Sequence, residues 1–291
     1  MSNKLKGEIQ KDVLNAWWKK GGKGTAECAT GFGKCRVGVL ASSHIARTIF
    51  SANILIVVPT TAISDEWTKE FYKWKESKTF NNNVKIECIN TARKFKNEHY
   101  DLVICDEIHN YINGEKNLEF FKNNTWDKIL GLSATIEISL LDSLNKIAPI
   151  CYTLNLYQAV ELGLISDFTV YNIPVKLSTA ERKMYDELSS KIAFSWERYG
   201  KHSWKNISLR KNILYTAKAK MRLLEKIIDI FDTSTYGIVF SMTKDYSNSV
   251  KKTLGEKCLV HHSGITKKKR IETLKKFSDN RTKSKILSQV L

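Results

Sequence analysis

The sequence predicts an α/β protein with parallel sheets, and three observations support this class. Short apolar runs of strand length recur along the first half of the chain, and stretches with apolar residues at helical spacing separate them. These runs give way to polar residues at their C-terminal ends, which form the ligand-binding edge of an open parallel sheet. The chain has 291 residues, of which 42% are hydrophobic and 26% charged, so it is long enough for two globular domains.

The first half of the chain is expected to form five buried strands. Residues 8–19 are expected to form an amphipathic helix ahead of the first strand. A helix with Trp67, Phe71 and Trp74 on one face follows the second strand, and such an aromatic stripe is more typical of a core-facing helix than of a stacking surface. The strands are expected at residues 24–29, 53–58, 84–89, 100–105 and 128–132.

A glycine-rich turn follows the first strand. Gly31 and Gly33 let the backbone direct its N–H groups toward phosphate oxygens, and the helix that begins next adds the positive end of its dipole. Lys34 is then placed to contact the β- and γ-phosphates of a nucleotide. Cys28 stands where the full motif has its first glycine, and Cys35 replaces the hydroxyl residue that holds Mg²⁺. A Gly-x-Gly-Lys match alone is weak, because glycine turns at strand ends are common.

An acidic pair follows the fourth strand. Asp106 and Glu107 come after four apolar residues, and in this setting Asp106 is expected to hold Mg²⁺ and Glu107 to polarise an attacking water. A helix cap or a solvated turn is the competing interpretation. The pair stands between the glycine-rich loop and the segment Ser133–Thr135, and His109 follows it closely. This order, with each segment at a strand end, is a much rarer coincidence than any one segment alone.

Four segments together resemble motifs I, Ia, II and III of superfamily-2 helicases. The branch is the DExH type, and the resemblance is to phage and XPB-type DNA helicases and translocases. Asn90-Thr91-Ala92 stands where this family has motif Ib, and Gln10 stands where it has its adenine-recognising glutamine. The four segments are residues 29–34, 58–60, 106–109 and 131–135.

The resemblance implies two RecA-like lobes with ATP between them and nucleic acid across their top. It assigns residues 1–165 to the first, ATP-binding lobe and residues 166–291 to a second lobe that is incomplete. ATP and Mg²⁺ are the implied cofactors, and the implied catalytic residues are Glu107, Lys34 and Asp106.

The same resemblance assigns further roles by position. Asp106 and Cys35 are the implied metal positions. His109, Ser133 and Thr135 are expected to couple the nucleotide state to the grip on nucleic acid. The backbone of the nucleic-acid strand is expected along Pro59, Thr60, Thr91 and Arg93. The nucleotide-binding residues are expected to be Gln10, Thr30, Gly31, Phe32, Gly33, Lys34, Cys35 and Arg36.

Charge and cysteine content narrow the class of protein. The 47 Lys and Arg exceed the 30 Asp and Glu, which gives a formal charge of +17 and favours a nucleic-acid partner. A lysine-rich solvated surface is the alternative, and charge alone does not decide between them.

The six cysteines form no C-x-x-C pair, as is typical of reduced thiols in an intracellular protein. We expect a cytoplasmic protein, in the host cytoplasm if viral, with no membrane partner.

The second half of the chain matches the helicase pattern more loosely. Residues 157–165 resemble the connector into the second lobe. Ser178 and Glu181 form a Ser-x-x-Glu capping box at the start of a helix that is expected to reach Trp196. Residues 197–212 are basic with interleaved aromatics, which suits contact with single-stranded nucleic acid, but a solvated loop is equally compatible with this composition.

Three further segments complete the pattern. Residues 236–241 resemble motif IV, and residues 258–264 resemble the strand and turn before the next helix. The two histidines in the latter have no third ligand at a useful spacing, so they predict no metal site. Residues 285–291 resemble the strand that leads into motif V, and we expect this strand to lie at an exposed sheet edge.

The sequence therefore predicts an ATP-driven helicase or translocase on nucleic acid, with DNA favoured over RNA. Motif VI, with its arginine fingers, is not found in the sequence. The main alternative is a truncated or split helicase that binds ATP and nucleic acid without efficient hydrolysis until a separate C-terminal fragment is supplied. The translocase subunit of a restriction system is a weaker alternative, since no nuclease pattern is visible.

Overall fold

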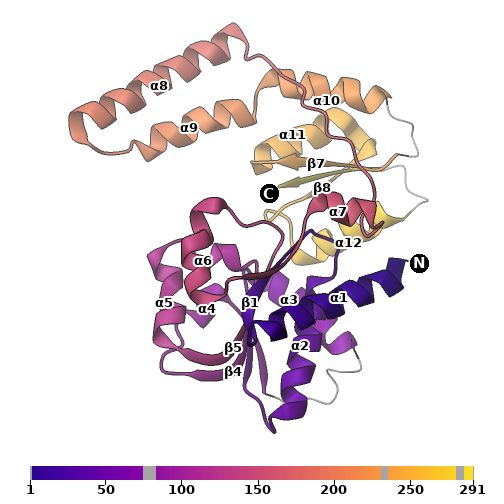
Figure 1. Cartoon of the computed structure of the whole chain (residues 1–291). Helices are drawn as coiled ribbons and strands as arrows, with labels where there is room; N and C mark the ends of the chain where they lie inside the picture. The colour runs from indigo at the N-terminus through magenta and orange to yellow at the C-terminus, as the bar shows by residue number, and fades with distance from the viewer. Residues whose placement is uncertain (1, 75–82, 231–234, 280–284, 291) are drawn as a thin grey trace. The chain divides into compact units, whose positions relative to one another are not determined.

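The computed structural model describes residues 2–74, 83–230, 235–279 and 285–290. The chain divides into two compact units, Met1–Thr169 and Val170–Leu291. Figure 1 shows the helices and strands of both units.

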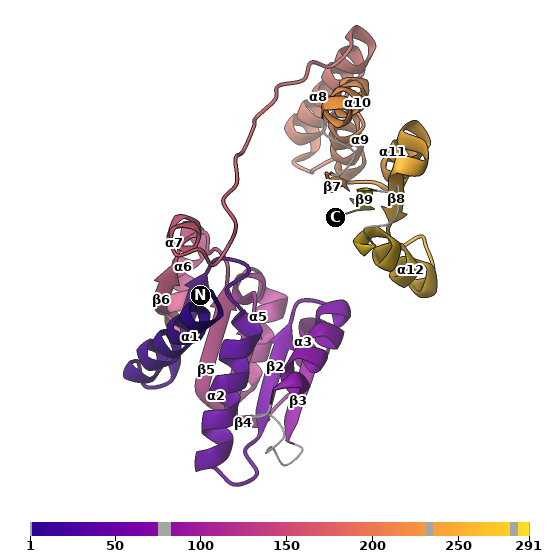
Figure 2. The same cartoon turned by 90° about the vertical axis from the view of Figure 1, so that its right-hand side faces the viewer.

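The first unit is built on a six-stranded parallel sheet with the strand order β3-β2-β4-β5-β1-β6. Each pair of neighbouring strands runs in parallel, so the C-terminal ends of all six strands share one edge (Figure 2). The strands are β1 (Lys23–Cys28), β2 (Ile54–Val58), β3 (Val84–Cys88), β4 (His99–Asp106), β5 (Thr125–Ser133) and β6 (Ile150–Leu154).

Helices cover both faces of this sheet. Side chains of α1, α2 and α3 enter one hydrophobic cluster, and those of α4, α5 and α6 enter the cluster on the other face. In β2, Ile54 and Ile56 face the first cluster whereas Leu55 and Val57 face the second, which is why this strand has a continuous apolar sequence. The helices are α1 (Ser2–Lys19), α2 (Lys34–Thr48), α3 (Thr61–Lys73), α4 (Ile89–Ala92), η2 (Ile108–Asn110), α5 (Glu115–Asn123), η3 (Ile138–Leu140), α6 (Leu141–Ile147) and α7 (Leu156–Glu161).

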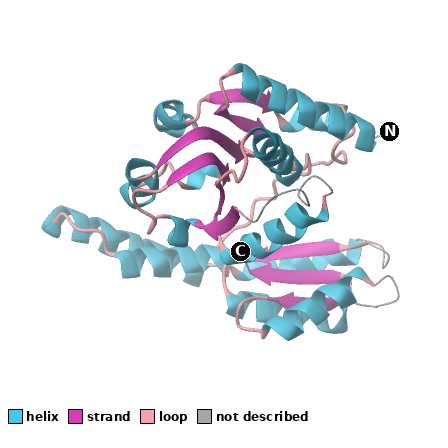
Figure 3. Cartoon of the chain, turned by 90° about the horizontal axis from the view of Figure 1, so that it is seen from below, coloured by secondary structure: helices cyan, strands magenta, loops and turns pink. Residues whose placement is uncertain are grey.

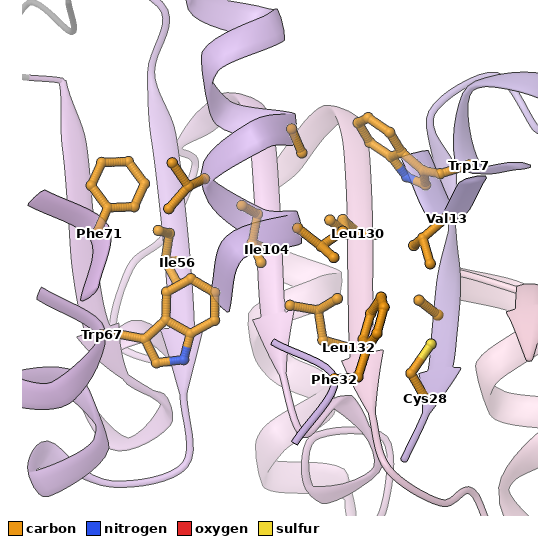
Figure 4. Close-up of a cluster of buried hydrophobic side chains, with 14 of the residues drawn as sticks. Val13, Trp17, Cys28, Phe32, Ile56, Trp67, Phe71, Ile104, Leu130 and Leu132 are labelled. Atoms are coloured by element: carbon orange, nitrogen blue, oxygen red, sulfur yellow. The ribbon is translucent and has the colours of Figure 1, made fainter. Parts of the chain in front are cut away.

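Figure 4 shows the first cluster at close range. Val13 and Trp17 of α1 pack at one end of it, and Trp67 and Phe71 of α3 pack at the other. The Trp17 indole N–H donates to the carbonyl oxygen of Ile129 at 2.8 Å, so this fully buried ring has its hydrogen-bond partner. The aromatic stripe of α3 thus belongs to the core.

Two expectations for the first unit were wrong in extent. The sheet has six strands rather than five, because β6 pairs with β1 at the edge of the sheet. Most of β6 is only half-buried, so it lacks the continuous apolar run that marked the other strands. The first helix begins at Ser2 rather than at residue 8.

The second unit contains a three-stranded parallel sheet with the order β7-β9-β8, which Figure 3 shows from below. Both units are therefore parallel α/β structures, and the predicted fold class is confirmed. The elements of this unit are α8 (Thr179–Tyr199), α9 (Trp204–Tyr215), α10 (Lys218–Ile230), β7 (Gly237–Ser241), α11 (Lys244–Leu254), η4 (Gly255–Lys257), β8 (Cys258–His261), α12 (Lys267–Ser278) and β9 (Ile286–Val290).

The predicted capping box at the start of α8 is present. The Ser178 backbone N–H donates to Glu181 Oε2 at 2.8 Å, and the Glu181 N–H donates to Ser178 Oγ at 3.4 Å. The second carboxylate oxygen of Glu181 accepts the Lys218 backbone N–H at 2.9 Å, at the start of α10. One glutamate therefore binds the first turns of two helices, and these contacts lower its pKa.

One expectation for the second unit was wrong. The last strand, β9, lies between β7 and β8 and is paired on both sides, so it is not an exposed edge; Leu291 lies outside the described residues. Residues 197–212 are mostly helical rather than a loop, because α8 continues to Tyr199 and α9 begins at Trp204, and no residue of either helix is buried. No residue of α9 is buried, so its sequence lacks the apolar periodicity that predicts a helix.

The cysteines and the hydropathy of the helices are two further features of the described residues. All six cysteines are unpaired, and four of them are buried. No helix within the described ranges combines the length and the apolar character needed to cross a membrane.

The packing of α3 gives a matched stability test. Phe71 is fully buried, whereas its neighbour Tyr72 is 52% exposed. Phe71→Ala should lower the free energy of unfolding by about 3–5 kcal/mol through reduced burial and a residual cavity, and Tyr72→Ala should change it by about 0.5 kcal/mol. Guanidinium unfolding of the full chain measures both. Equal denaturation midpoints for the two variants would contradict the placement of Phe71 in the core.

Candidate nucleotide-binding site

The topology of the first sheet gathers the predicted catalytic residues at one edge. Lys34 begins α2 just after β1, and Asp106 ends β4. β5 lies between these two strands, so Ser133 at its end is placed between them. Segments about 100 residues apart in the sequence meet here.

Lys34 and Glu107 form an ion pair across this edge. The Lys34 Nζ lies 2.7 Å from Glu107 Oε1, and the two side chains are only 13% and 26% exposed. The backbone of Glu107 has φ +52° and ψ +52°, a left-handed conformation that costs a non-glycine residue on the order of 1–3 kcal/mol. Surrounding contacts hold the residue there, and such strain is typical of functional sites.

The other carboxylate oxygen of Glu107 faces the predicted coupling residues. Ser133 Oγ lies 3.4 Å from Glu107 Oε2, and His109 Nδ1 lies 3.5 Å from the same oxygen. His109 Nδ1 and Ser133 Oγ are 2.7 Å apart, and Ser133 Oγ is also 2.9 Å from the Thr135 carbonyl oxygen. A hydroxyl has one hydrogen, so Ser133 donates to only one of these acceptors at a time. The network can therefore adopt more than one hydrogen-bonding arrangement.

Asp106 is held by a tryptophan of the core. Its Oδ2 accepts the Trp67 indole N–H at 2.7 Å, and its backbone oxygen accepts the Tyr111 hydroxyl. The side chain is 8% exposed, and this burial raises its pKa, while the bond from Trp67 acts in the opposite direction. The sequence identified Trp67 only as a core residue. Only a general rule could have indicated this contact, namely that a buried indole N–H needs a hydrogen-bond acceptor.

Of the two predicted metal positions, Asp106 and Cys35, only Asp106 has donor atoms that suit a hard cation. The Asp106 carboxylate is the oxygen ligand that Mg²⁺ prefers. Burial raises the pKa of the Cys35 thiol to about 12, so this group is neutral at pH 7. A neutral thiol is a poor ligand for Mg²⁺. Asp106 therefore fits the implied ion, and Cys35 does not supply the hydroxyl of the usual loop.

The glycine-rich turn is packed against α1. Gly31 and Gly33 have φ of +82° and +93°, and a Cβ on Gly33 would lie 2.7 Å from Gln10 Nε2. The Gln10 amide donates to the Phe32 carbonyl oxygen at 3.1 Å, so this glutamine supports the turn. The Phe32 ring is buried in the core, which leaves only its backbone for a ligand. Thr30 is exposed at the turn.

Arg36, in the first turn of α2, lies over an aromatic ring. Its guanidinium carbon is 4.0 Å from the centre of the Trp74 ring, which is a cation–π distance. This contact directs Arg36 toward the end of α3. To bind a nucleotide, the Arg36 side chain would have to do so while it contacts Trp74 or after it leaves that ring.

The four predicted nucleic-acid residues follow β2 and β3 at the same edge of the sheet. Thr60 caps α3, where its Oγ1 accepts the Ile63 N–H at 3.4 Å. Pro59 and Thr91 are partly exposed. Arg93 lines a surface depression whose other basic residues are Lys94, Lys96 and Lys116.

The buried carboxylate of Asp106 should reduce stability at neutral pH. Because its pKa is higher in the folded chain than in the unfolded chain, the folded state is favoured at acidic pH and loses this advantage as the pH rises through the folded pKa. In buffer with a chelator, Asp106→Asn should therefore raise the melting temperature at pH 7, and the difference from wild type should shrink toward pH 4. Thermal melts at several pH values measure this. The same change at exposed Asp12 serves as the control, and a pH-independent effect of Asp106→Asn would contradict the argument.

Comparison with known proteins gives a family model that matches the first part of the chain. Residues 4–138 match the family model described as "Type III restriction enzyme, res subunit". This segment spans every predicted site residue from Gln10 to Thr135. The restriction class is the alternative that the sequence analysis ranked as weaker. No curated protein matches the sequence significantly.

Solved structures of similar fold align with most of the chain. The crystal structure of the Pyrococcus furiosus Hef helicase domain aligns with a TM-score of 0.54 and 12% identity, over 97% of this chain and 85% of that chain. S. cerevisiae Dbp5 bound to RNA and ADP BeF3 aligns with a TM-score of 0.55 and 15% identity, over 97% of this chain and 69% of that chain. Residues 4–138 are therefore similar to the domain that this family model describes, and the chain shares the RecA-like α/β fold of these solved structures.

Proposed function

We propose that the chain is an ATP-driven helicase or translocase that acts on nucleic acid, with DNA favoured over RNA. The observation that carries the proposal is the cluster of Lys34, Glu107 and Ser133 at one sheet edge, with Asp106 beside it. All four lie in the segment that matches the ResIII model, and a domain of this type implies an ATPase. The finer assignment, to a DExH helicase of the phage or XPB type, is part of the proposal.

The ion pair suggests how nucleotide binding prepares hydrolysis. Backbone N–H groups of the glycine-rich turn and the Lys34 ammonium would hold the phosphates. Phosphate oxygens compete with Glu107 for Lys34, so nucleotide binding would free Glu107 Oε1 to accept a proton from water. Mg²⁺ bound at Asp106 would neutralise charge on the phosphates during the transfer.

The contacts of Glu107 also suggest how hydrolysis is coupled to movement. Ser133 and His109 both contact its second oxygen, and Ser133 also contacts Thr135. Ile136, which follows Thr135, donates its backbone N–H to Glu27 Oε1 of β1 at 2.9 Å. A displacement of the segment after β5 would therefore move the groups that orient Glu107.

Charge supports nucleic acid as the second ligand. The chain carries a formal charge of +17. The proposed strand contacts, Pro59, Thr60, Thr91 and Arg93, follow the same sheet edge as the catalytic cluster, and Arg93 lies among basic side chains. Binding through these groups releases counterions and should weaken as salt rises.

The family match favours one second candidate, the translocase subunit of a restriction system. The two candidates differ in whether the strands of a duplex are separated. Displacement of a triplex-forming strand, with no release of a strand from a forked duplex, would favour this candidate. Release from the forked duplex would favour a helicase.

Lys34 and Glu107 should differ in their effects. Lys34→Ala removes a charged contact with phosphate and should weaken nucleotide binding by about tenfold or more. Glu107→Gln removes the proposed base and the ion-pair partner of Lys34. It should therefore preserve or tighten nucleotide binding while lowering ATP hydrolysis by about 100-fold or more.

Fluorescent-nucleotide titration and phosphate release measure these two effects. Glu161→Gln, on the exposed end of α7, is the control for the loss of one acidic charge. Wild-type hydrolysis by the Glu107→Gln variant would refute the assignment of the base.

Cys35 should limit metal-dependent binding. Cys35→Thr supplies a hydroxyl of suitable hardness, so it should lower the Mg²⁺ concentration needed for half-maximal nucleotide binding. Cys35→Val introduces a side chain with the shape of threonine but without the hydroxyl, so it should not lower the required Mg²⁺ concentration. A Mg²⁺ titration of nucleotide binding compares the three proteins. Identical titrations for Thr and Val would show that position 35 takes no part in holding the ion.

A further inference from the structure

The helices α8 and α9 form a hairpin that projects from the rest of the second unit. Figure 1 shows the two helices side by side, with their connecting turn far from the sheet of β7, β8 and β9. No residue of either helix is buried. We call residues 194–205, which comprise the end of α8, the turn and the start of α9, the hairpin tip.

The composition of the hairpin tip is unusual for a solvated turn. Four of its residues are aromatic, compared with 10% aromatic residues across the chain, and three are basic against the single acid Glu197. The aromatic side chains are largely exposed: Trp204 is 72% exposed, Tyr199 60%, Phe194 54% and Trp196 53%. The hairpin tip therefore offers apolar ring faces and positive charge on the same surface.

The rings are ordered against one another. The imidazole of His202 stacks on Trp196 with centroids 4.6 Å apart and an interplanar angle of 24°, and it lies 5.3 Å from the Trp204 ring. The turn is held by Ser195 Oγ, which donates to the Lys201 carbonyl oxygen at 3.1 Å. The rings thus lie against one another although they are exposed.

Basic side chains accompany these rings. The Arg198 guanidinium lies 5.5 Å from the Phe194 ring and 5.6 Å from the Tyr199 ring. Lys201 and Lys205 are exposed on either side of His202. A flat ring with a cation beside it suits a ligand that has alternating planar groups and negative charges.

We propose that the hairpin tip binds unpaired bases of a nucleic-acid strand by stacking on Trp196 and Trp204, with Arg198, Lys201 and Lys205 on the adjacent phosphates. This inference rests on the proposed nucleic-acid function and adds a contact outside the two sheets. Charge and ring exposure together favour single strands, because the bases of a duplex are already stacked and paired. The contact is independent of sequence, since every base has a π-face.

The test separates stacking from charge by removing bases from the ligand. The full chain is titrated with a fluorescein-labelled single strand of thymidines and with the same strand carrying abasic sites. The double variant Trp196→Ala/Trp204→Ala should bind the thymidine strand about fivefold more weakly or worse, and it should bind the abasic strand as wild type does. Equal binding of the thymidine strand by variant and wild type would overturn the proposal.

Two control variants exclude other causes. Trp196→Phe/Trp204→Phe keeps flat rings and should retain most of the affinity. Phe50→Ala removes a ring that is 88% exposed in the first unit and should leave binding unchanged. Equal losses on both strands would assign the effect of the alanine variant to altered folding of the hairpin and would also overturn the stacking contact.

Salt dependence tests the basic residues separately. Lys201→Gln/Lys205→Gln should reduce the slope of log affinity against log salt by about 0.7 for each phosphate that is no longer neutralised, whereas the tryptophan variants should keep the wild-type slope. An unchanged slope in the lysine variant would remove these residues from the proposed binding surface.

Failure of this inference is distinguishable from failure of the proposed function. If the wild-type chain binds neither strand at any salt concentration, the nucleic-acid function fails and the hairpin contact with it. If wild type binds and the alanine variant binds equally, only the hairpin contact fails. A change in sedimentation of the alanine variant, without a change in strand binding, would instead identify the hairpin tip as a contact between copies of the chain.

Discussion

A parallel sheet that is buried on both faces imposes the main constraint on the first unit. Where its strands are buried on both faces, as in β2, they carry no charged group, because each face packs against helices. Charged groups of the central strands therefore stand toward the strand ends, and parallel strands end together. Lys34 and Glu107 meet at 2.7 Å for this reason, although 72 residues of sequence lie between them. The core thus determines where the site can be before any ligand contributes.

The exception to this rule is Asp106, whose carboxylate is partly inside the core. Trp67 compensates by donating to it at 2.7 Å. The same indole packs with the apolar side chains of α3 and the sheet, so one ring contributes both to stability and to the electrostatics of the site. Burial nevertheless raises the pKa of Asp106, so the charged carboxylate that the proposed metal binding requires lowers the stability of the folded chain.

The spacing of apolar residues in the sequence predicted most of the buried strands and helices. Strands such as β2, buried on both faces, have continuous apolar sequences, and the capping box at Ser178 marked the start of α8. The half-buried strand β6 and the exposed helix α9 were missed because neither has an apolar face to reveal its period. At the site, order along the chain identified Lys34, Asp106 and Glu107. Their contacts with Trp67 and Ser133 could not be predicted, because they depend on strand order in the sheet rather than on spacing in the sequence.

Glu181 joins two helices at the root of the hairpin. Its two carboxylate oxygens bind the first turns of α8 and α10. α8 has 21 residues and is about 30 Å long at ~1.5 Å per residue. The aromatic end of the hairpin is therefore about one helix length from the residue that ties α8 to α10, so the hairpin presents its exposed rings well away from the sheet of the second unit.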